Sequence, residues 1–355
     1  MDILIATDAW RPQVNGVVRS LESMAKAAGA LGARIDFVTP RDFNCVPMPT
    51  YPEIGLAIAT PRAVARKLEQ GYDHVHIATE GPVGLAARAC CMDRRRIFTT
   101  SYHTRFPEYV HARAAIPVDW SYAYLRWFHN GGAGTMVSTQ SLARELSERN
   151  FKRMLRWSRG VDHATFNAKA QVELDFPRPI FLYAGRLAVE KNLDAFLSLD
   201  LPGTKLVAGD GPERKRLEAQ YPNARFVGVK SSAELAPLYA SCDVFVFPSR
   251  TDTFGIVLLE AMACGAPVAA FPTPGPLDVV GASGAGVLDE DLRAAALAAL
   301  RVDREIPLRH ARTFTWENSA RQFLDAVSIA RGSPPPARRP GEECDFALGR
   351  NVARP

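Results

Sequence analysis

Two carboxylates, Asp252 and Glu260, stand on either side of a segment that is typical of a helix start. The apolar run 243–248 before them predicts a buried strand that ends at a proline, and 255–263 predicts a helix. In a helix, this spacing puts the carboxylates about 12 Å apart on broadly the same side. The free N–H groups of a helix start favour an anion such as phosphate. A sugar nucleotide has the matching order of sugar hydroxyls, diphosphate and ribose hydroxyls, so the stretch predicts a site for one.

Two cations, Arg186 and Lys191, follow the strand predicted at 179–185, where a helix is expected to begin. Cations in this position suit a diphosphate and would stabilise it as a leaving group. A solvated charged turn is the alternative. Gly185, which lets the backbone approach a ligand closely, favours the functional interpretation.

Three residues of the first half follow predicted strands in the same way. Gly16 precedes a helix, where a glycine lets the backbone approach a phosphate, although Asn15-Gly16 alone is more typical of an ordinary helix start. His103 follows the strand 97–101 and can hydrogen-bond a sugar hydroxyl or stabilise charge in a transition state. A packed loop histidine is the equal alternative. Glu80 has a similar position, where a helix-start carboxylate is the stronger interpretation.

The elements that must position these residues form two series in which strands and helices alternate. Such alternation is typical of parallel sheets covered on both faces, so we predict an α/β fold with two doubly wound domains. Their ligands lie at the carboxyl ends of the strands, and two facing domains enclose a cleft. The predicted strands are 3–6, 34–39, 75–78, 97–101, 135–138, 179–185, 204–208, 225–227, 244–247 and 268–271.

The 355 residues are enough for two ordinary domains, predicted over 1–165 and 166–330 with a polar linker around 165–178. The last helix, around 316–330, belongs to the second domain or returns to the first. Residues 331–355, rich in proline and arginine, predict a disordered tail.

The composition, 47% hydrophobic and 23% charged, is that of a soluble globular protein. Six cysteines without a Cys-x-x-Cys pair predict reduced thiols in the cytoplasm. The chain starts directly with a strand, which predicts no signal peptide, and no apolar run approaches the roughly 20 residues that span a bilayer. No Gly-x-Gly-x-x-Gly or P-loop motif is present, so a dehydrogenase or a kinase is poorly supported.

The net charge of +5 is uneven, because residues 1–165 hold 21 Lys and Arg against 15 Asp and Glu. The excess is too diffuse for a protein that binds nucleic acid, and aromatic residues do not alternate with it. One interpretation is contact between the first half and an anionic surface such as lipid headgroups. An ordinary arginine-rich composition is the other.

Taken in order along the chain, these residues form a specific set. The chain resembles the retaining, sugar-nucleotide-dependent glycosyltransferases of the glycogen-synthase-like family 4, which have the two-domain GT-B fold. The resemblance extends to about residue 330 and rests most on Asp252-x7-Glu260. The other motifs that carry it are Asn15-Gly16-Val17, Ser158-Arg-Gly-Val-Asp162, Gly185-Arg-Leu followed by Glu190-Lys-Asn192, and Gly209-Asp-Gly-Pro212.

The resemblance implies that residues 1–165 bind the acceptor and 166–330 the sugar nucleotide. It places His103 near the reacting carbon of the donor sugar, Asp252 at hydroxyls of that sugar and Glu260 at the ribose. It implies no metal or other cofactor.

The remaining implied contacts with the donor follow the same motifs. Gly16, Arg186 and Lys191 would contact the diphosphate, and Val229 and Lys230 lie where the family builds its base pocket. The further candidates are Asn15, Glu80, Arg159, Gly185, Asp210 and the backbone amides of Phe254, Gly255 and Ile256.

One residue departs from the family pattern. The first carboxylate of the family is usually Glu, and Asp252 is one methylene shorter, which changes its reach by about 1.5 Å. We expect its role to survive and the shorter side chain to bear on the choice of donor sugar.

Two stretches, 6–19 and 102–109, are similar to a narrower bacterial branch that builds glycolipids. That branch comprises diacylglycerol glucosyl- and glucuronosyltransferases and phosphatidylinositol mannosyltransferases, which attach peripherally to membranes through the N-terminal domain. The candidate contacts are Arg94-Arg95-Arg96 and the aromatic, basic stretch 106–128. A solvated charged turn with ordinary helix packing is the alternative.

The predicted reaction transfers a hexosyl group from a nucleoside diphosphate sugar to an acceptor hydroxyl with retention of configuration. UDP-glucose or UDP-glucuronate is the favoured donor and GDP-mannose the next; a membrane lipid such as diacylglycerol is the favoured acceptor. No carboxylate is placed as a nucleophile, so we predict front-face attack with the leaving phosphate accepting the proton. The alternatives are a soluble or polysaccharide acceptor, a sugar-nucleotide 2-epimerase, and a non-catalytic carbohydrate- or membrane-binding module.

Overall fold

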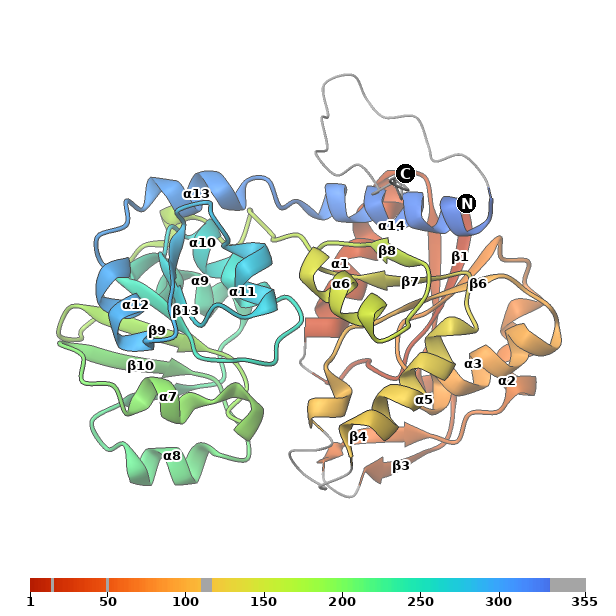
Figure 1. The fold of residues 1–355 in the computed structure, drawn as a ribbon, viewed down its shortest axis with the longest axis horizontal. Helices are drawn as coiled ribbons and strands as arrows, with labels where there is room; N and C mark the ends of the chain where they lie inside the picture. Colours follow the sequence, from red (N-terminus) through yellow and green to blue (C-terminus); the bar gives the residue numbers. More distant parts are fainter. Residues whose placement is uncertain (14–15, 49–50, 110–116, 333–355) are drawn as a thin grey trace, which may run out of the picture.

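The computed structural model describes residues 1–13, 16–48, 51–109 and 117–332, which form two α/β domains that face each other (Figure 1). Each domain is built on a six-stranded sheet in which all neighbouring strands are parallel. The predicted α/β class with two doubly wound sheets is therefore confirmed. Asn15 and residues 333–355 of the predicted tail lie outside the described residues.

The first sheet has the strand order β2–β1–β5–β6–β7–β8, with α1 on one face and α2 and α3 on the other. Its strands are β1 (Asp2–Ala6), β2 (Arg34–Val38), β5 (His74–Ile77), β6 (Phe98–Ser101), β7 (Gly134–Val137) and β8 (Met154–Arg156). An antiparallel hairpin is formed by β3 (Cys45–Met48) and β4 (Tyr51–Ala57). The helices are α1 (Gly16–Ala30), α2 (Pro61–Leu68), α3 (Pro82–Asp93), α5 (Val118–Asn130) and α6 (Gln140–Glu148).

The second sheet has the order β11–β10–β9–β12–β13–β14, with α9 and α10 on one face and α7, α8 and α12 on the other. Its strands are β9 (Ile180–Ala184), β10 (Thr204–Ala208), β11 (Arg225–Gly228), β12 (Val244–Phe247), β13 (Val268–Ala270) and β14 (Gly286–Leu288). Its helices are α7 (Leu193–Leu197), α8 (Arg214–Gln220), α9 (Ser232–Ser241), α10 (Ile256–Ala263), α11 (Pro274–Val279), α12 (Leu292–Ala299) and α13 (Glu305–Ala311).

The central strands form because their residues are apolar on both faces. Every residue of β9 and of β12 is buried, as expected for parallel strands covered by helices on both sides. Hydroxyl side chains cap several of the described helices: Thr139, for example, accepts from the N–H of Leu142 at α6, and Ser231 from that of Glu234 at α9. Within the described ranges, no helix is long and apolar enough to cross a bilayer.

The strand order reverses once in each sheet. β1 lies between β2 and β5, and β9 lies between β10 and β12. Loops that leave such strands diverge, and the crevice between them is where doubly wound sheets bind ligands. In the second domain, these loops are 185–191 after β9 and 248–255 after β12. Six of the predicted site residues lie in them: Gly185, Arg186, Lys191, Asp252, Phe254 and Gly255.

The chain passes between the domains along two segments that lie side by side. The Val161 N–H donates to the carbonyl of Phe314 at 3.1 Å, next to a parallel bridge between Val161 and Thr315. Gly160 permits this approach, because an added Cβ would lie 2.4 Å from the backbone nitrogen of Trp316. Helix α14 (Trp316–Ala330) then packs against α1 and covers the same face of the first sheet (Figure 1).

Candidate active site

An ion pair between Lys191 and Asp252 lies where the loops after β9 and β12 meet. Lys191 Nζ is 2.6 Å from Oδ1 and 2.9 Å from Oδ2 of Asp252. The two side chains are only 20% and 18% exposed. Burial alone would lower the pKa of Lys191, but the adjacent carboxylate raises it overall, so the lysine remains charged.

The loop backbones fix this pair in place. Lys191 ends a 3-10 turn, and Asn192 follows it in the left-handed region with φ 55°. The Asn192 side-chain amide donates to the carbonyl of Pro248 at 3.1 Å, and the Thr251 hydroxyl donates to that of Glu190 at 3.2 Å. These hydrogen bonds join the two loops and so fix the position of Lys191 relative to Asp252.

Helix α10 begins directly after this loop and next to the first domain. Gly255 has φ 79°, and an added Cβ would lie 3.0 Å from both Phe247 Cζ and Leu258 Cδ1, so only glycine fits. The nearest atom to a Cβ built on Gly16 of α1 is Ile256 Cγ2, at 3.9 Å. Gly16 therefore faces the start of α10, whose free N–H groups are the predicted phosphate contacts.

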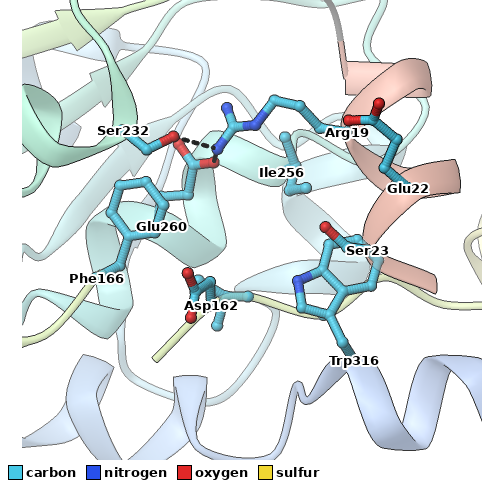
Figure 2. Close-up of a pocket in the computed structure, with 11 residues that line it drawn as sticks. Arg19, Glu22, Ser23, Asp162, Phe166, Ser232, Ile256, Glu260 and Trp316 are labelled. Carbon is cyan, nitrogen blue, oxygen red and sulfur yellow. Dashed lines mark hydrogen bonds and ion pairs between the residues drawn. The ribbon is translucent and has the colours of Figure 1, made fainter. Parts of the chain in front are cut away.

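Glu260 lies one turn into α10 and is 1% exposed. It forms an ion pair with Arg19 of α1, and its other oxygen accepts from the hydroxyl of Tyr239 at 3.3 Å. Burial raises the pKa of Glu260, although Arg19 and Tyr239 oppose that shift. Arg19 also donates to the hydroxyl of Ser232 at 3.3 Å, so the first domain reaches directly onto the second (Figure 2).

A cavity of about 150 Å³ lies between the domains at this ion pair. Figure 2 shows Arg19 and Ser232 meeting at Glu260 on one side of it, with Asp162 and Trp316 on the other. Charged and hydroxyl side chains make up much of this lining, which suits a polar ligand.

His103 follows β6 and connects the first domain to the loop of Asp252. Its Nδ1 is 2.9 Å from Arg159 Nη2, and its carbonyl accepts from the Thr253 hydroxyl at 2.6 Å. The Ser138 hydroxyl donates to the Thr253 carbonyl at 3.2 Å. Thr253 is thus hydrogen-bonded twice across the cleft, and His103 lies beside the loop that carries Asp252.

Comparison with known proteins shows the family of the chain. Residues 14–165 match the family described as Glycosyltransferase Family 4, and residues 165–301 match Glycosyl transferases group 1. A GDP-mannose-dependent alpha-mannosyltransferase of Mycolicibacterium smegmatis is 31% identical over 81% of this chain and 84% of its own length. The chain belongs to the family 4 glycosyltransferases. It is an enzyme that transfers a hexosyl group from a nucleotide sugar.

Two further relatives of this glycosyltransferase carry other names and cover different shares of its length. Sulfoquinovosyl transferase SQD2 of Arabidopsis thaliana is 30% identical over 70% of this chain, which spans only 51% of that protein. Alpha-monoglucosyldiacylglycerol synthase of Streptococcus pneumoniae is 24% identical over 91% of this chain and 83% of its own length. The fold matches sucrose-phosphate synthase from Thermosynechococcus elongatus with a TM-score of 0.74 at 20% identity, over 93% of this chain and 99% of the other.

Other predicted residues of the glycosyltransferase lie around the same crevice. Arg186 is exposed, and its carbonyl accepts from the hydroxyl of Tyr183 at 2.9 Å. Gly185 lies against Gly209, where an added Cβ would meet the Gly185 carbonyl oxygen at 1.9 Å, so the loops after β9 and β10 pack backbone to backbone. Val229 is exposed at the end of β11.

Three predicted charged residues already have protein partners. Asp210 accepts from the N–H of Gly211 and pairs with Arg214 at 3.1 Å. Lys230 lies 3.5 Å from Glu234, and Glu80 lies 3.1 Å from His129 Nε2. None of these contacts tests substrate binding, so the roles assigned from the sequence stay predictions.

Sequence reasoning missed Arg19 and Asp8. Asp8 accepts from the N–H of Val83 at 2.7 Å and of Gly84 at 3.2 Å, so its carboxylate caps α3. Burial raises the pKa of Asp8 although these bonds oppose it. The signal for Arg19 was its place three residues after Gly16, on the turn of α1 that faces α10.

Among the residues that the structure describes, no group of three or more His, Cys, Asp or Glu side chains is arranged to hold a metal ion.

Proposed function

We propose that this glycosyltransferase moves a hexosyl group to a hydroxyl of a membrane lipid such as diacylglycerol, with retention of configuration. The observation that carries the proposal is the bracketing of the α10 start by the Lys191–Asp252 pair and by buried Glu260. This arrangement offers charged groups on both sides of free helix-start N–H groups, which suits the chemistry of a nucleoside diphosphate sugar. The relative named as a monoglucosyldiacylglycerol synthase supports the lipid acceptor.

In this proposal, the loops before α10 and the first turn of this helix hold different parts of the donor. Arg186 and Lys191 bind the diphosphate, Asp252 binds hydroxyls of the sugar, and Glu260 binds the ribose. Because Lys191 contacts both oxygens of Asp252, the sugar and the diphosphate must meet beside this pair. The bond between the anomeric carbon and the phosphate oxygen would then lie near His103, whose carbonyl accepts from Thr253 next to Asp252.

The acceptor oxygen attacks the anomeric carbon from the face that the diphosphate leaves. The carbon–oxygen bond to the phosphate breaks, and the departing phosphate oxygen takes the proton of the acceptor hydroxyl. Negative charge grows on the diphosphate during this step, so Arg186 and Lys191 stabilise the transition state more than the bound donor. We propose that these cations make a metal ion unnecessary.

Two donor classes enter this proposal. The sequence favours a UDP-hexose, glucose or glucuronate, before GDP-mannose. The mannosyltransferase from Mycolicibacterium smegmatis, named as GDP-mannose-dependent, supports GDP-mannose. Asp252 would contact the sugar of either donor, so its shorter side chain does not distinguish the two classes. A panel of donors distinguishes them.

We expect one nucleoside diphosphate sugar of a panel with UDP and GDP to release nucleotide faster with diacylglycerol vesicles than with vesicles of phosphatidylcholine alone. Nucleotide release is measured by a coupled assay, and the anomeric configuration of the product by NMR. Acceleration only by soluble sugars would contradict the lipid acceptor. A free epimerised sugar nucleotide without nucleotide release would identify an epimerase.

Exposed aromatic side chains of α5 support peripheral attachment of the first domain to a membrane. Trp120 is 73% and Trp127 53% exposed, and the Arg88 guanidinium lies 3.9 Å from the Trp127 ring. Large aromatic rings beside a cation are typical of the interface between lipid and water. Of the predicted basic contacts, Arg96 instead donates to the carbonyl of Tyr72, and Arg94 lies 3.4 Å from Glu69.

Replacing Trp120 and Trp127 together by serine should weaken binding to anionic vesicles by about tenfold or more, because each ring loses buried apolar area in the membrane. Co-sedimentation with vesicles measures the effect. Leu300→Ser removes an exposed apolar side chain from the second domain and is the matched control. Equal loss in both variants would contradict attachment through α5.

A further inference from the structure

We propose that Arg159 is a positioning residue that holds His103 in one tautomer, so that its Nε2–H is a fixed hydrogen-bond donor in the cleft. The direction of this donor toward the sugar nucleotide rests on the function proposed above. The sequence places Arg159 among substrate contacts, whereas its surroundings in the structure point to action through His103.

The tautomer follows from the chemistry of the guanidinium. Arg159 Nη2 lies 2.9 Å from His103 Nδ1, and a guanidinium carries only donors. Nδ1 must therefore accept, and the single proton of the neutral ring is on Nε2. This assignment depends on the type of the partner and not on any hydrogen position.

Arg159 is itself held so that its donors are used inside the protein. Its Nη1 donates to the carbonyls of Trp157 at 2.7 Å and Ser158 at 3.2 Å. The guanidinium lies 4.2 Å from the Trp157 ring, and the residue is 6% exposed. With two carbonyls, a ring face and His103 around it, Arg159 has a fixed orientation and little surface for a ligand.

His103 Nε2 is buried and has no hydrogen-bond partner among the described residues. A buried N–H without a partner is costly, which makes it a ready donor for an oxygen of a bound ligand. The His103 carbonyl accepts from Thr253, the neighbour of Asp252, so the ring is fixed relative to the loop that carries the predicted sugar contact.

The surroundings also keep the ring neutral. The charged and titratable groups that face it are Arg159 after β8, His76 on β5 and His129 on α5. Burial, followed by Arg159, lowers the pKa of His103 well below its usual range. A neutral ring with its proton on Nε2 cannot accept a proton there from the acceptor hydroxyl. His103 therefore donates a hydrogen bond and does not act as a general base.

Nitrogen-15 NMR of the histidine rings in the full chain reads the tautomer directly, with His103→Asn identifying the signal among the seven histidines. The wild-type ring should carry its proton on Nε2 throughout the range from about pH 5 to 8, in which an ordinary histidine titrates. Arg159→Met should give a mixture of tautomers and a ring that titrates. A wild-type ring protonated on Nδ1, or an unchanged tautomer in Arg159→Met, would overturn the inference.

Kinetics distinguish positioning from a general loss of structure. Arg159→Met should lower kcat about tenfold, the value of one hydrogen bond, and add an acidic limb to the pH profile that the wild type lacks. Arg159→Lys and Arg159→Gln, which can still donate to Nδ1, should recover part of the loss and most of the tautomer. No recovery by either variant would contradict positioning through Nδ1.

Arg105→Met is the matched control, because Arg105 is also buried near His103 but donates to Glu145 at 2.8 Å. It should lower stability without changing the tautomer or adding an acidic limb; a changed tautomer in this variant would overturn the specific role of Arg159. If Arg159→Met shifts the tautomer while kcat and KM stay at wild-type values, the positioning stands and the proposed role of His103 in catalysis fails.

Discussion

Replacing Lys191 by alanine is expected to lower kcat by about two to three orders of magnitude, the range found when one group that stabilises developing charge is removed. Charge grows on the diphosphate only as its bond to the sugar breaks. A cation beside that bond therefore acts mainly in the transition state, and kcat should fall more than KM rises. Nucleotide release at saturating donor measures the effect.

Lys191→Ala should reduce the stability of the fold less than it reduces kcat. Lys191 and Asp252 are each about one-fifth exposed, so water can solvate part of the carboxylate left behind. We expect the free energy of unfolding to fall by about 1–2 kcal/mol, between the values for exposed and buried pairs. Urea unfolding with activity measured on the same samples separates the two effects.

Lys205→Ala is the matched control in the same domain, because Lys205 donates to the carbonyl of Leu197 at 2.6 Å and lies on β10 away from the crevice. It should reduce stability slightly and leave kcat near the wild-type value. Unaltered turnover in Lys191→Ala would falsify the proposed role of this residue at the diphosphate.

Replacing Glu260 by alanine should raise the donor KM by about 10- to 100-fold and change kcat much less. Hydrogen bonds to a charged group contribute about 1.5–3 kcal/mol, which corresponds to this range. The ribose does not change during the reaction, so its contacts stabilise the bound donor and the transition state alike. Initial rates over a range of donor concentration separate KM from kcat.

Two further variants decide whether Glu260 binds the donor or only joins the domains. Glu22→Ala removes another carboxylate from the lining of the same cavity. Glu22 pairs with Arg11 at 2.5 Å, and its loss should leave the donor KM unchanged. Glu260→Gln keeps the shape and should lose less than Glu260→Ala. A fall in kcat with an unchanged donor KM in Glu260→Ala would contradict the proposal that Glu260 binds the ribose.

The sequence was most informative for the long apolar strands and the residues that follow them. β9 and β12 are buried along their whole length, and their carboxyl ends bring Lys191 and Asp252 together although they are far apart in the chain. The carboxyl ends of parallel strands lie at one edge of the sheet. The local sequence pattern of each strand was therefore enough to predict that the residues after them meet.

Elements and residues that depend on distant partners were missed. β8 and β14 have three residues each and, unlike the equally short β13, are not buried along their whole length, so no apolar run marks them. The β3–β4 hairpin contains Pro47 and Pro52 within its strands. Arg19 resembles any charged residue on a helix surface until the second domain is placed against it. Arg159 was included for its motif alone, and its contact with His103 is visible only in three dimensions.

The two interdomain segments lie side by side at Val161 and Thr315, and the line through them is the natural hinge axis between the domains. Any rotation of one domain about this line moves nearby atoms little and distant atoms more. The cavity at Arg19 and Glu260 lies close to this hinge axis, because residues of both interdomain segments line it: Gly160 to Asp162 and Trp316. A nucleoside held there would keep its contacts through an opening that frees the far end of the cleft for a new acceptor.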